Sequence, residues 1–82
     1  MITVRFFGLL RLKVDNKIIV LEGKTIEELL RNVNMEYSDI SISELKNSQI
    51  FVNGENILNS KLFKTKLNDN DEVHILSSVA GG

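Results

Sequence analysis

The sequence predicts an α+β domain, in which a mixed sheet of about five strands carries one main helix packed on one face. Alternating apolar and polar residues indicate strands at both ends of the chain, over residues 2–7 and 72–77. A capped amphipathic helix is predicted between them, with further short apolar runs on either side. We expect this domain to span residues 1–77 and a flexible tail to span residues 78–82.

The first two strands are predicted to form a hairpin. Residues 2–7 place Ile2, Val4 and Phe6 on one face of a strand that ends at Gly8. A second apolar run, residues 17–21, follows the turn formers Asp15-Asn16. Residues 9–14 show neither the alternation of a strand nor the spacing of an amphipathic helix, and the sequence leaves their structure open.

The helix begins with a capping box. Thr25 is followed three residues later by Glu28, and the next apolar residues recur with helical spacing at Ile26, Leu29, Leu30 and Val33. A helix this short is not stable alone in water, so its apolar stripe must pack on the sheet. Over residues 34–48 no period dominates, and either a loop or a short turn of helix could pack Ile40, Ile42 and Leu45 on the core.

Three strands are predicted after this segment, over residues 49–52, 56–58 and 72–77. Asn53-Gly54 is a tight-turn signal between the first two, and the turn cluster of residues 68–71 precedes the last. A crossover chain can place its first and last strands side by side and parallel, so we expect both in the middle of the sheet.

Composition excludes several classes of protein. The chain has 82 residues, a net charge of −1 and no cysteine, so a disulfide framework, a cysteine metal site and a thiol nucleophile are excluded. A domain of this size has one small core and no enclosed cofactor site. Because basic and acidic residues are nearly equal in number, the composition gives no support for binding to nucleic acid or to acidic membranes. The longest apolar run, residues 18–21, is too short to cross a membrane, and without a signal-like start the expected location is cytoplasmic.

Motifs for catalysis within the chain are lacking. The five glycines form neither a phosphate-binding loop nor a dinucleotide fingerprint. The single histidine, His74, is interpreted as a surface residue, because it cannot complete a triad or a metal site with these neighbours. We interpret two charged groups as solvated surface, the carboxylates of Asp69, Asp71 and Glu72 and the lysines at positions 61, 64 and 66. We therefore expect no bound metal or cofactor and no activity of the chain alone.

The Gly81-Gly82 ending is the unusual feature. Glycine occupies two given positions by chance in about 0.5% of sequences. Without Cβ atoms, these residues can pass through a narrow channel and present the terminal carboxylate. That carboxylate is ionised at neutral pH and inert as an acyl donor, so acyl chemistry would require activation by a nucleotide-binding partner.

Taken together, the chain resembles the ubiquitin-like β-grasp sulfur carriers, and among them the small subunits of molybdopterin synthase (MoaD-like). The matching segments span the chain: Val4 to Gly8 with Arg11, the Thr25 to Leu30 helix start, Phe51 to Gly54, Leu67 through Val73, and Val79-Ala80-Gly81-Gly82. These relatives commonly have two prolines before the tail, which stiffen it. Here Ser77-Ser78 stand in that place, and a looser tail is expected.

The resemblance implies that this chain is a sulfur donor, which partner enzymes load with sulfur again after each transfer. An E1-like (MoeB-like) enzyme would use ATP to adenylate Gly82, and a persulfide from a sulfur-donor enzyme would convert it to a thiocarboxylate. The tail would then enter the MoaE-like large subunit, where sulfur builds the dithiolene that holds molybdenum or tungsten. The chain would thus be the sulfur-donating subunit of a sulfurtransferase. Alternatives are a carrier for thiazole synthesis or another thiolation pathway, a ubiquitin-like protein modifier, and an adaptor with an idle tail.

The resemblance also implies a docking surface. Phe7 and Leu76 match partner-binding positions and share the sheet face opposite the predicted core, where Ile57 or Leu58 would extend an exposed apolar patch. Residues 34–48 could instead fold over this face. Val79 and Ala80 are expected to bind with the tail. Arg11 matches a family position, and the sequence leaves open whether it stabilises the fold or meets a partner's carboxylate.

Overall fold

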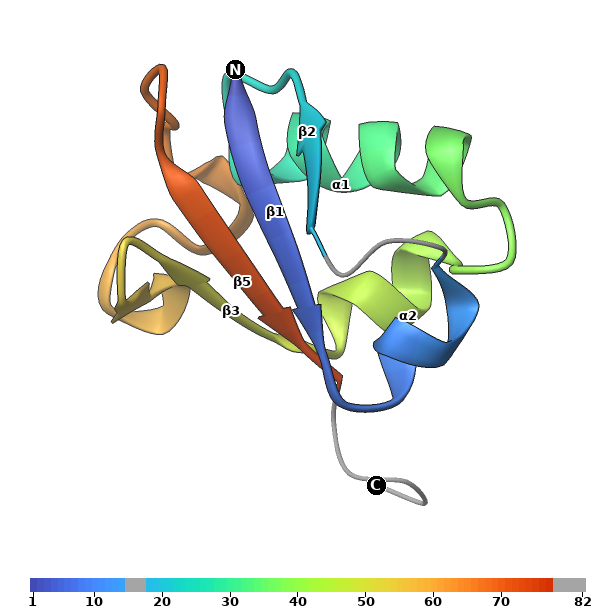
Figure 1. Ribbon diagram of the computed structural model, residues 1–82. Helices are drawn as coiled ribbons and strands as arrows, with labels where there is room; N and C mark the ends of the chain where they lie inside the picture. Colours follow the sequence, from blue (N-terminus) through green and yellow to red (C-terminus); the bar gives the residue numbers. More distant parts are fainter. Residues whose placement is uncertain (15–17, 78–82) are drawn as a thin grey trace.

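The computed structural model describes residues 1–14 and 18–77. The strands are β1 (Ile2–Phe7), β2 (Ile18–Leu21), β3 (Gln49–Val52), β4 (Glu55–Asn56) and β5 (Glu72–Leu76). The helices are α1 (Ile26–Glu36) and α2 (Ile42–Lys46), and three 3-10 turns are η1 (Gly8–Lys13), η2 (Ile57–Asn59) and η3 (Leu62–Lys64). Figure 1 shows α1 lying behind a single twisted sheet. The predicted α+β class is confirmed.

The sheet has the order β2-β1-β5-β3-β4. Strands β1 and β5 pair in parallel at its centre, with Val4 opposite Val73 and Phe7 opposite Leu76. The other neighbouring pairs are antiparallel. The prediction of two central parallel strands is therefore confirmed, and the chain leaves β5 beside the end of β1.

Helix α1 begins at the predicted cap. The Thr25 hydroxyl accepts a hydrogen bond of 3.2 Å from the Glu28 amide. The Glu28 carboxylate accepts a hydrogen bond of 3.1 Å from the Lys24 amide, the residue before the cap. The helix then buries its apolar stripe against the sheet, together with residues from η1 and the 34–48 segment. The fully buried core residues include Val4, Phe6, Leu10, Ile26, Leu29, Leu30, Val33, Ile40, Leu45, Val73 and Ile75.

Gly23 lies where β2 connects to α1. A Cβ at this position would lie 2.9 Å from the Leu29 Cβ and 3.0 Å from its Cα. These contacts are closer than side chains tolerate, so glycine is required by the approach of the chain to the helix.

The fourth strand is shorter than predicted. We expected a strand over residues 56–58, but β4 is Glu55–Asn56 and the chain then turns into η2. The Asn56 side chain is the cause, because its Oδ1 accepts a hydrogen bond of 2.9 Å from the Leu58 amide and caps the turn. Ile57 consequently faces the core instead of continuing the strand.

Two segments without a predicted structure are short helical pieces. Residues 8–13 form η1, which packs Leu10 into the core. Within residues 34–48, helix α2 is capped by the Ser41 hydroxyl, which accepts a hydrogen bond of 3.0 Å from the Glu44 amide. Both pieces cover the core on its helix side.

Candidate functional site

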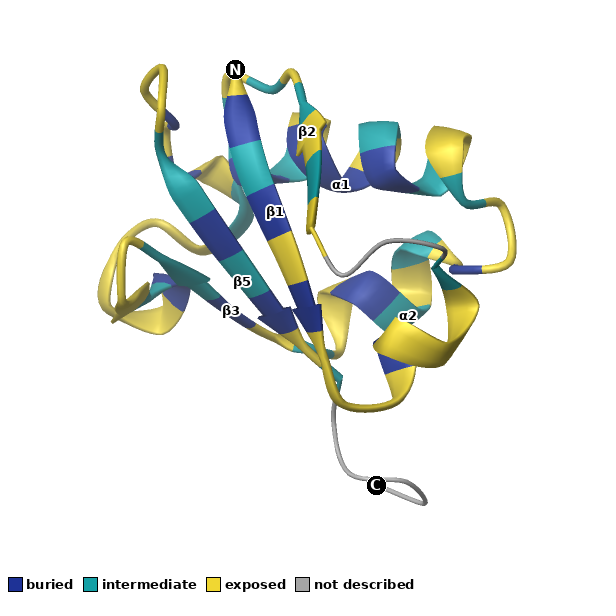
Figure 2. Cartoon of the chain, viewed as in Figure 1, coloured by how far each residue is buried: buried dark blue, intermediate teal, exposed yellow. Residues whose placement is uncertain are grey.

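The sheet face opposite α1 is open. Phe7 and Leu76 are direct neighbours on this face, with 38% and 37% of their surface exposed. Ile18 and Val20 on the edge strand are also exposed. Figure 2 shows the alternation of buried and exposed residues along the central strands that separates this face from the core. Because Ile40 and Leu45 are buried in the core instead, residues 34–48 do not fold over the open face, and that alternative is wrong.

A charged trio lies on the open face. The Arg5 Nε is 2.8 Å from the Glu72 Oε2, and the His74 Nε2 is 2.6 Å from the same oxygen. An ionised carboxylate only accepts, so His74 donates this hydrogen bond. The hydrogen bond lowers the pKa of Glu72 below its usual 4.5; desolvation partly opposes the shift and the charge of Arg5 adds to it.

His74 connects the trio to the apolar pair. Its ring centroid is 5.1 Å from that of Phe7, with the two rings tilted by 56°. The residue is half-buried between neighbouring strands, directly opposite Arg5 in the register. His74 is therefore a surface residue as expected, and it lies within the open face.

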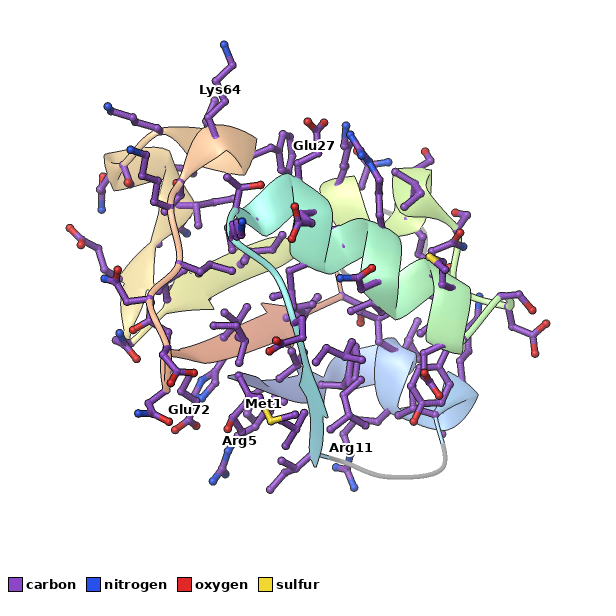
Figure 3. The ribbon with its side chains drawn as sticks, turned by 90° about the horizontal axis from the view of Figure 1, so that it is seen from above. Met1, Arg5, Arg11, Glu27, Lys64 and Glu72 are labelled. Atoms are coloured by element: carbon purple, nitrogen blue, oxygen red, sulfur yellow. The ribbon has the colours of Figure 1, made fainter. Side chains whose placement is uncertain are left out.

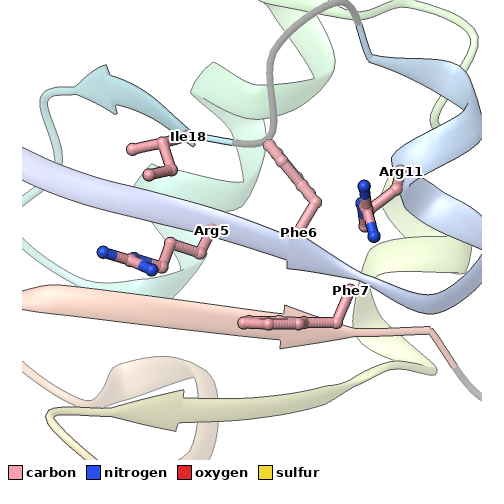
Figure 4. Close-up of a pocket in the computed structure, with 5 residues that line it drawn as sticks. All are labelled: Arg5, Phe6, Phe7, Arg11 and Ile18. Carbon is pink, nitrogen blue, oxygen red and sulfur yellow. The ribbon is translucent and has the colours of Figure 1, made fainter.

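A small hollow adjoins the face where β1 ends and β2 begins. It has a volume of about 130 Å³ and is lined by Arg5, Phe6, Phe7, Arg11 and Ile18. Figure 4 shows the two guanidinium groups coming from different elements, Arg5 from β1 and Arg11 from η1. Arg11 is exposed and makes no hydrogen bond or ion pair with a described residue.

The two further patch candidates lie elsewhere. Ile57 is 5% exposed and packs in the core, so it adds nothing to an exposed patch. Leu58 is 73% exposed, but it lies on η2, beyond β3 and β4 in the sheet order. Its role in partner binding stays a prediction. Val79, Ala80, Gly81 and Gly82 lie outside the described residues.

Within residues 1–14 and 18–77, no group of three or more His, Asp or Glu side chains is placed to hold a metal ion. None of the helices in these two ranges is long and apolar enough to cross a membrane. Figure 3 shows charged side chains distributed over the surface, with Arg5 and Glu72 together on one side and Glu27 and Lys64 on another.

Sequence reasoning missed several residues of the open face. Ile18 and Val20 stand opposite Arg5 and Thr3 in the hairpin register, and paired residues share a face of the sheet. The alternation of faces along each strand, which selected Phe7 and Leu76, also places the charged trio on this face. For Ile18 and Val20 the register of the hairpin was needed in addition.

Solved structures share this architecture. The structure of the small archaeal modifier protein 1 (SAMP1) of Methanosarcina acetivorans is similar to this one, with a TM-score of 0.88 and 24% identity. The match covers 99% of this chain and 95% of that one. The Amycolatopsis orientalis BexX/CysO complex contains a chain with a TM-score of 0.80 at 25% identity, with 100% of both chains covered. The five-stranded mixed sheet, the helix on one face and these likenesses define a ubiquitin-like β-grasp protein.

A third structure is a complex of subunits 1 and 2 of molybdopterin-converting factor from Helicobacter pylori 26695. It matches with a TM-score of 0.67 and 26% identity over 99% of this chain and 97% of that one. The family model of the ThiS family matches residues 4–82. The chain therefore belongs to the ThiS family, with the fold of the ubiquitin-like sulfur carriers. We found no match among curated protein sequences.

Proposed function

We propose that this chain is the sulfur-carrier subunit of a molybdopterin synthase, with the Gly82 carboxylate as its reactive group. A partner enzyme of the E1 type joins this carboxylate to the α-phosphate of ATP and releases pyrophosphate. A persulfide sulfur then displaces AMP, and reduction of the S–S bond by a partner thiol leaves a thiocarboxylate. No described residue of the chain performs these steps, so the catalytic groups belong to the partners.

The observation that carries this proposal is the position of the open face relative to the tail. Phe7 and Leu76 lie at the ends of the two central parallel strands, and the chain runs on from Leu76 to Gly82. A partner that covers this apolar pair is thereby next to the start of the tail. The complex of the two Helicobacter pylori subunits supports a large-subunit partner of the same kind.

The charges around the apolar pair suit a partner with carboxylates. Arg11 has no described partner, and the Arg5 guanidinium uses its Nε towards Glu72. Charged side chains at the rim of an interface orient the two proteins as they meet more than they increase the binding affinity. We propose that Arg11 meets an acidic side chain of the partner, at the edge of the hollow.

A second candidate is a sulfur carrier for another acceptor, such as a thiazole precursor. The BexX/CysO complex supports this candidate, because it contains a chain that matches over its full length and the complex is not described as a molybdopterin-converting factor. Ser77-Ser78 in place of the prolines expected for the molybdopterin synthase subunit point in the same direction. Activation at Gly82 is common to both candidates, and only the acceptor differs.

Deletion of Gly82 tests the shared chemistry. The truncated chain is expected to lose adenylation completely, measured as ATP–pyrophosphate exchange with the activating enzyme, while its melting transition stays unchanged. A truncated chain that still supports exchange would refute the proposal. The acceptor is identified by adding the thiocarboxylated chain to a molybdopterin synthase large subunit or to a thiazole synthase, and measuring which one consumes the sulfur.

A further inference from the structure

Ser77, the residue after β5, is tied to η1, which follows β1. Its hydroxyl oxygen accepts a hydrogen bond of 2.7 Å from the Leu9 amide, 68 residues away in the sequence. Its own amide donates a hydrogen bond of 3.3 Å to the Phe7 carbonyl. The expectation of a looser tail, drawn from Ser77-Ser78, stays a prediction, because residues 78–82 lie outside the described residues. Ser77 itself is held on both its side chain and its backbone.

Gly8 makes room for this contact. It has a φ of +70°, a conformation that side chains rarely adopt. A Cβ at this position would lie 2.5 Å from the Ser77 hydroxyl oxygen, which is too close for both to keep their places. The glycine therefore serves two purposes, the sharp turn after β1 and the approach of the serine.

We propose that Ser77 is a positioning residue, which fixes the point where the reactive tail leaves the domain. This inference rests on the proposed function, because it assigns a step of that function to a residue outside the Gly-Gly end. The hydrogen bonds join Ser77 to Phe7 and Leu9, and Phe7 is itself half of the exposed apolar pair Phe7–Leu76. A partner that covers this pair thus meets a tail that follows directly on a residue with a fixed place.

The expected effect of losing this anchor falls on the chemical step. Docking occurs through the open face and does not need Ser77. Once docked, a chain without the anchor must order one further residue before the Gly82 carboxylate reaches the nucleotide. Ordering one free backbone residue completely would slow such a step roughly 5- to 30-fold. Because the backbone hydrogen bond of residue 77 to Phe7 remains, we expect the lower end of this range, about 5- to 10-fold.

The experiment compares Ser77→Ala with Ser77→Thr, which keeps a hydroxyl, and with Ser43→Ala. Ser43 is an exposed serine whose hydroxyl makes no hydrogen bond with a described residue. Amide hydrogen exchange of Leu9 reports the hydrogen bond, and ATP–pyrophosphate exchange with the activating enzyme gives kcat and KM. In Ser77→Ala we expect fast exchange at Leu9 and a kcat lower by roughly 5- to 10-fold with little change in KM. Ser77→Thr and Ser43→Ala should behave as the unchanged protein.

The outcomes separate this inference from the proposed function. If Ser77→Ala loses protection at Leu9 but keeps its kcat, the hydrogen bond exists and does not position the tail. If Leu9 exchange is unchanged in Ser77→Ala, the contact itself is refuted. If the unchanged protein is not adenylated at all, the proposed function fails and the positioning role with it.

A double-mutant cycle adds a measurement that needs no partner. Gly8→Ala should displace the Ser77 hydroxyl and destabilise the fold, because of the 2.5 Å contact and the positive φ. In a Ser77→Ala background that contact is gone, and only the cost of the positive φ remains. The two substitutions should therefore be less destabilising together than the sum of their separate effects. Strict additivity would contradict the proposed contact.

Discussion

Replacement of Phe7 by alanine tests most sharply the proposal that a partner docks on the open face. Phe7 has 38% of its surface exposed beside Leu76, which for an aromatic side chain is on the order of 60–90 Å². Covering this surface contributes roughly 1.5–2 kcal/mol at about 25 cal/mol per Å². Phe7→Ala is therefore expected to weaken docking about 10- to 30-fold.

Titration calorimetry with the E1-like activating enzyme measures this loss directly. Phe7→Ala also removes the buried part of the side chain, so binding is measured well below the melting temperature, with the folded fraction checked by circular dichroism. The matched control is Leu12→Ala, because Leu12 is 83% exposed on η1, outside the sheet face. Unchanged affinity for Phe7→Ala, or an equal loss for Leu12→Ala, would refute the assignment of the open face.

Three further predictions concern the fold that supports this face. Thr25→Ala removes the cap on the Glu28 amide and should lower the free energy of unfolding by about 1 kcal/mol in urea titrations, whereas Thr25→Ser should keep it. Gly23→Ala places a Cβ 2.9 Å from the Leu29 Cβ and should cost about 1–3 kcal/mol by the same measurement. Glu72→Gln should flatten the acid side of the stability profile: the folded pKa of Glu72 lies below its usual 4.5, so its stabilising effect is present above that pH and is lost as pH falls through the folded pKa.

Each of these predictions has a clear contrary result. Equal stability of the alanine and serine variants at position 25 would show that the hydroxyl does not cap α1. An unchanged or raised stability of Gly23→Ala would show that the chain can move away from Leu29. A Glu72→Gln variant with the same acid profile as the unchanged protein would show that another carboxylate causes the loss.

Local signals in the sequence predicted those elements that have a period or a cap. The alternation of residues 2–7 and the Thr25–Glu28 pair each correspond to an observed strand or helix start. The same kind of signal, Ser41 followed by Glu44, caps α2. It was overlooked because no apolar period accompanies a helix of five residues.

The candidate site was predictable where it depends on strand parity. Phe7 and Leu76 share a face and are direct neighbours, as two parallel central strands require. Ile57 was misplaced because the Asn56 side chain ends β4 early and turns the next residue inward. The Ser77–Leu9 hydrogen bond joins residues 68 apart, and no local pattern reports a contact of that range.

The mass of the intact chain purified from its native cell tests the central claim most directly. The account predicts a fraction of the protein heavier by the exchange of one oxygen for one sulfur, with the change located by fragmentation at Gly82. This fraction should disappear when the activating enzyme is deleted. A chain that carries no sulfur at Gly82 under conditions of active cofactor synthesis, or that occurs only in higher-mass conjugates with other proteins, would contradict the assignment as a sulfur carrier.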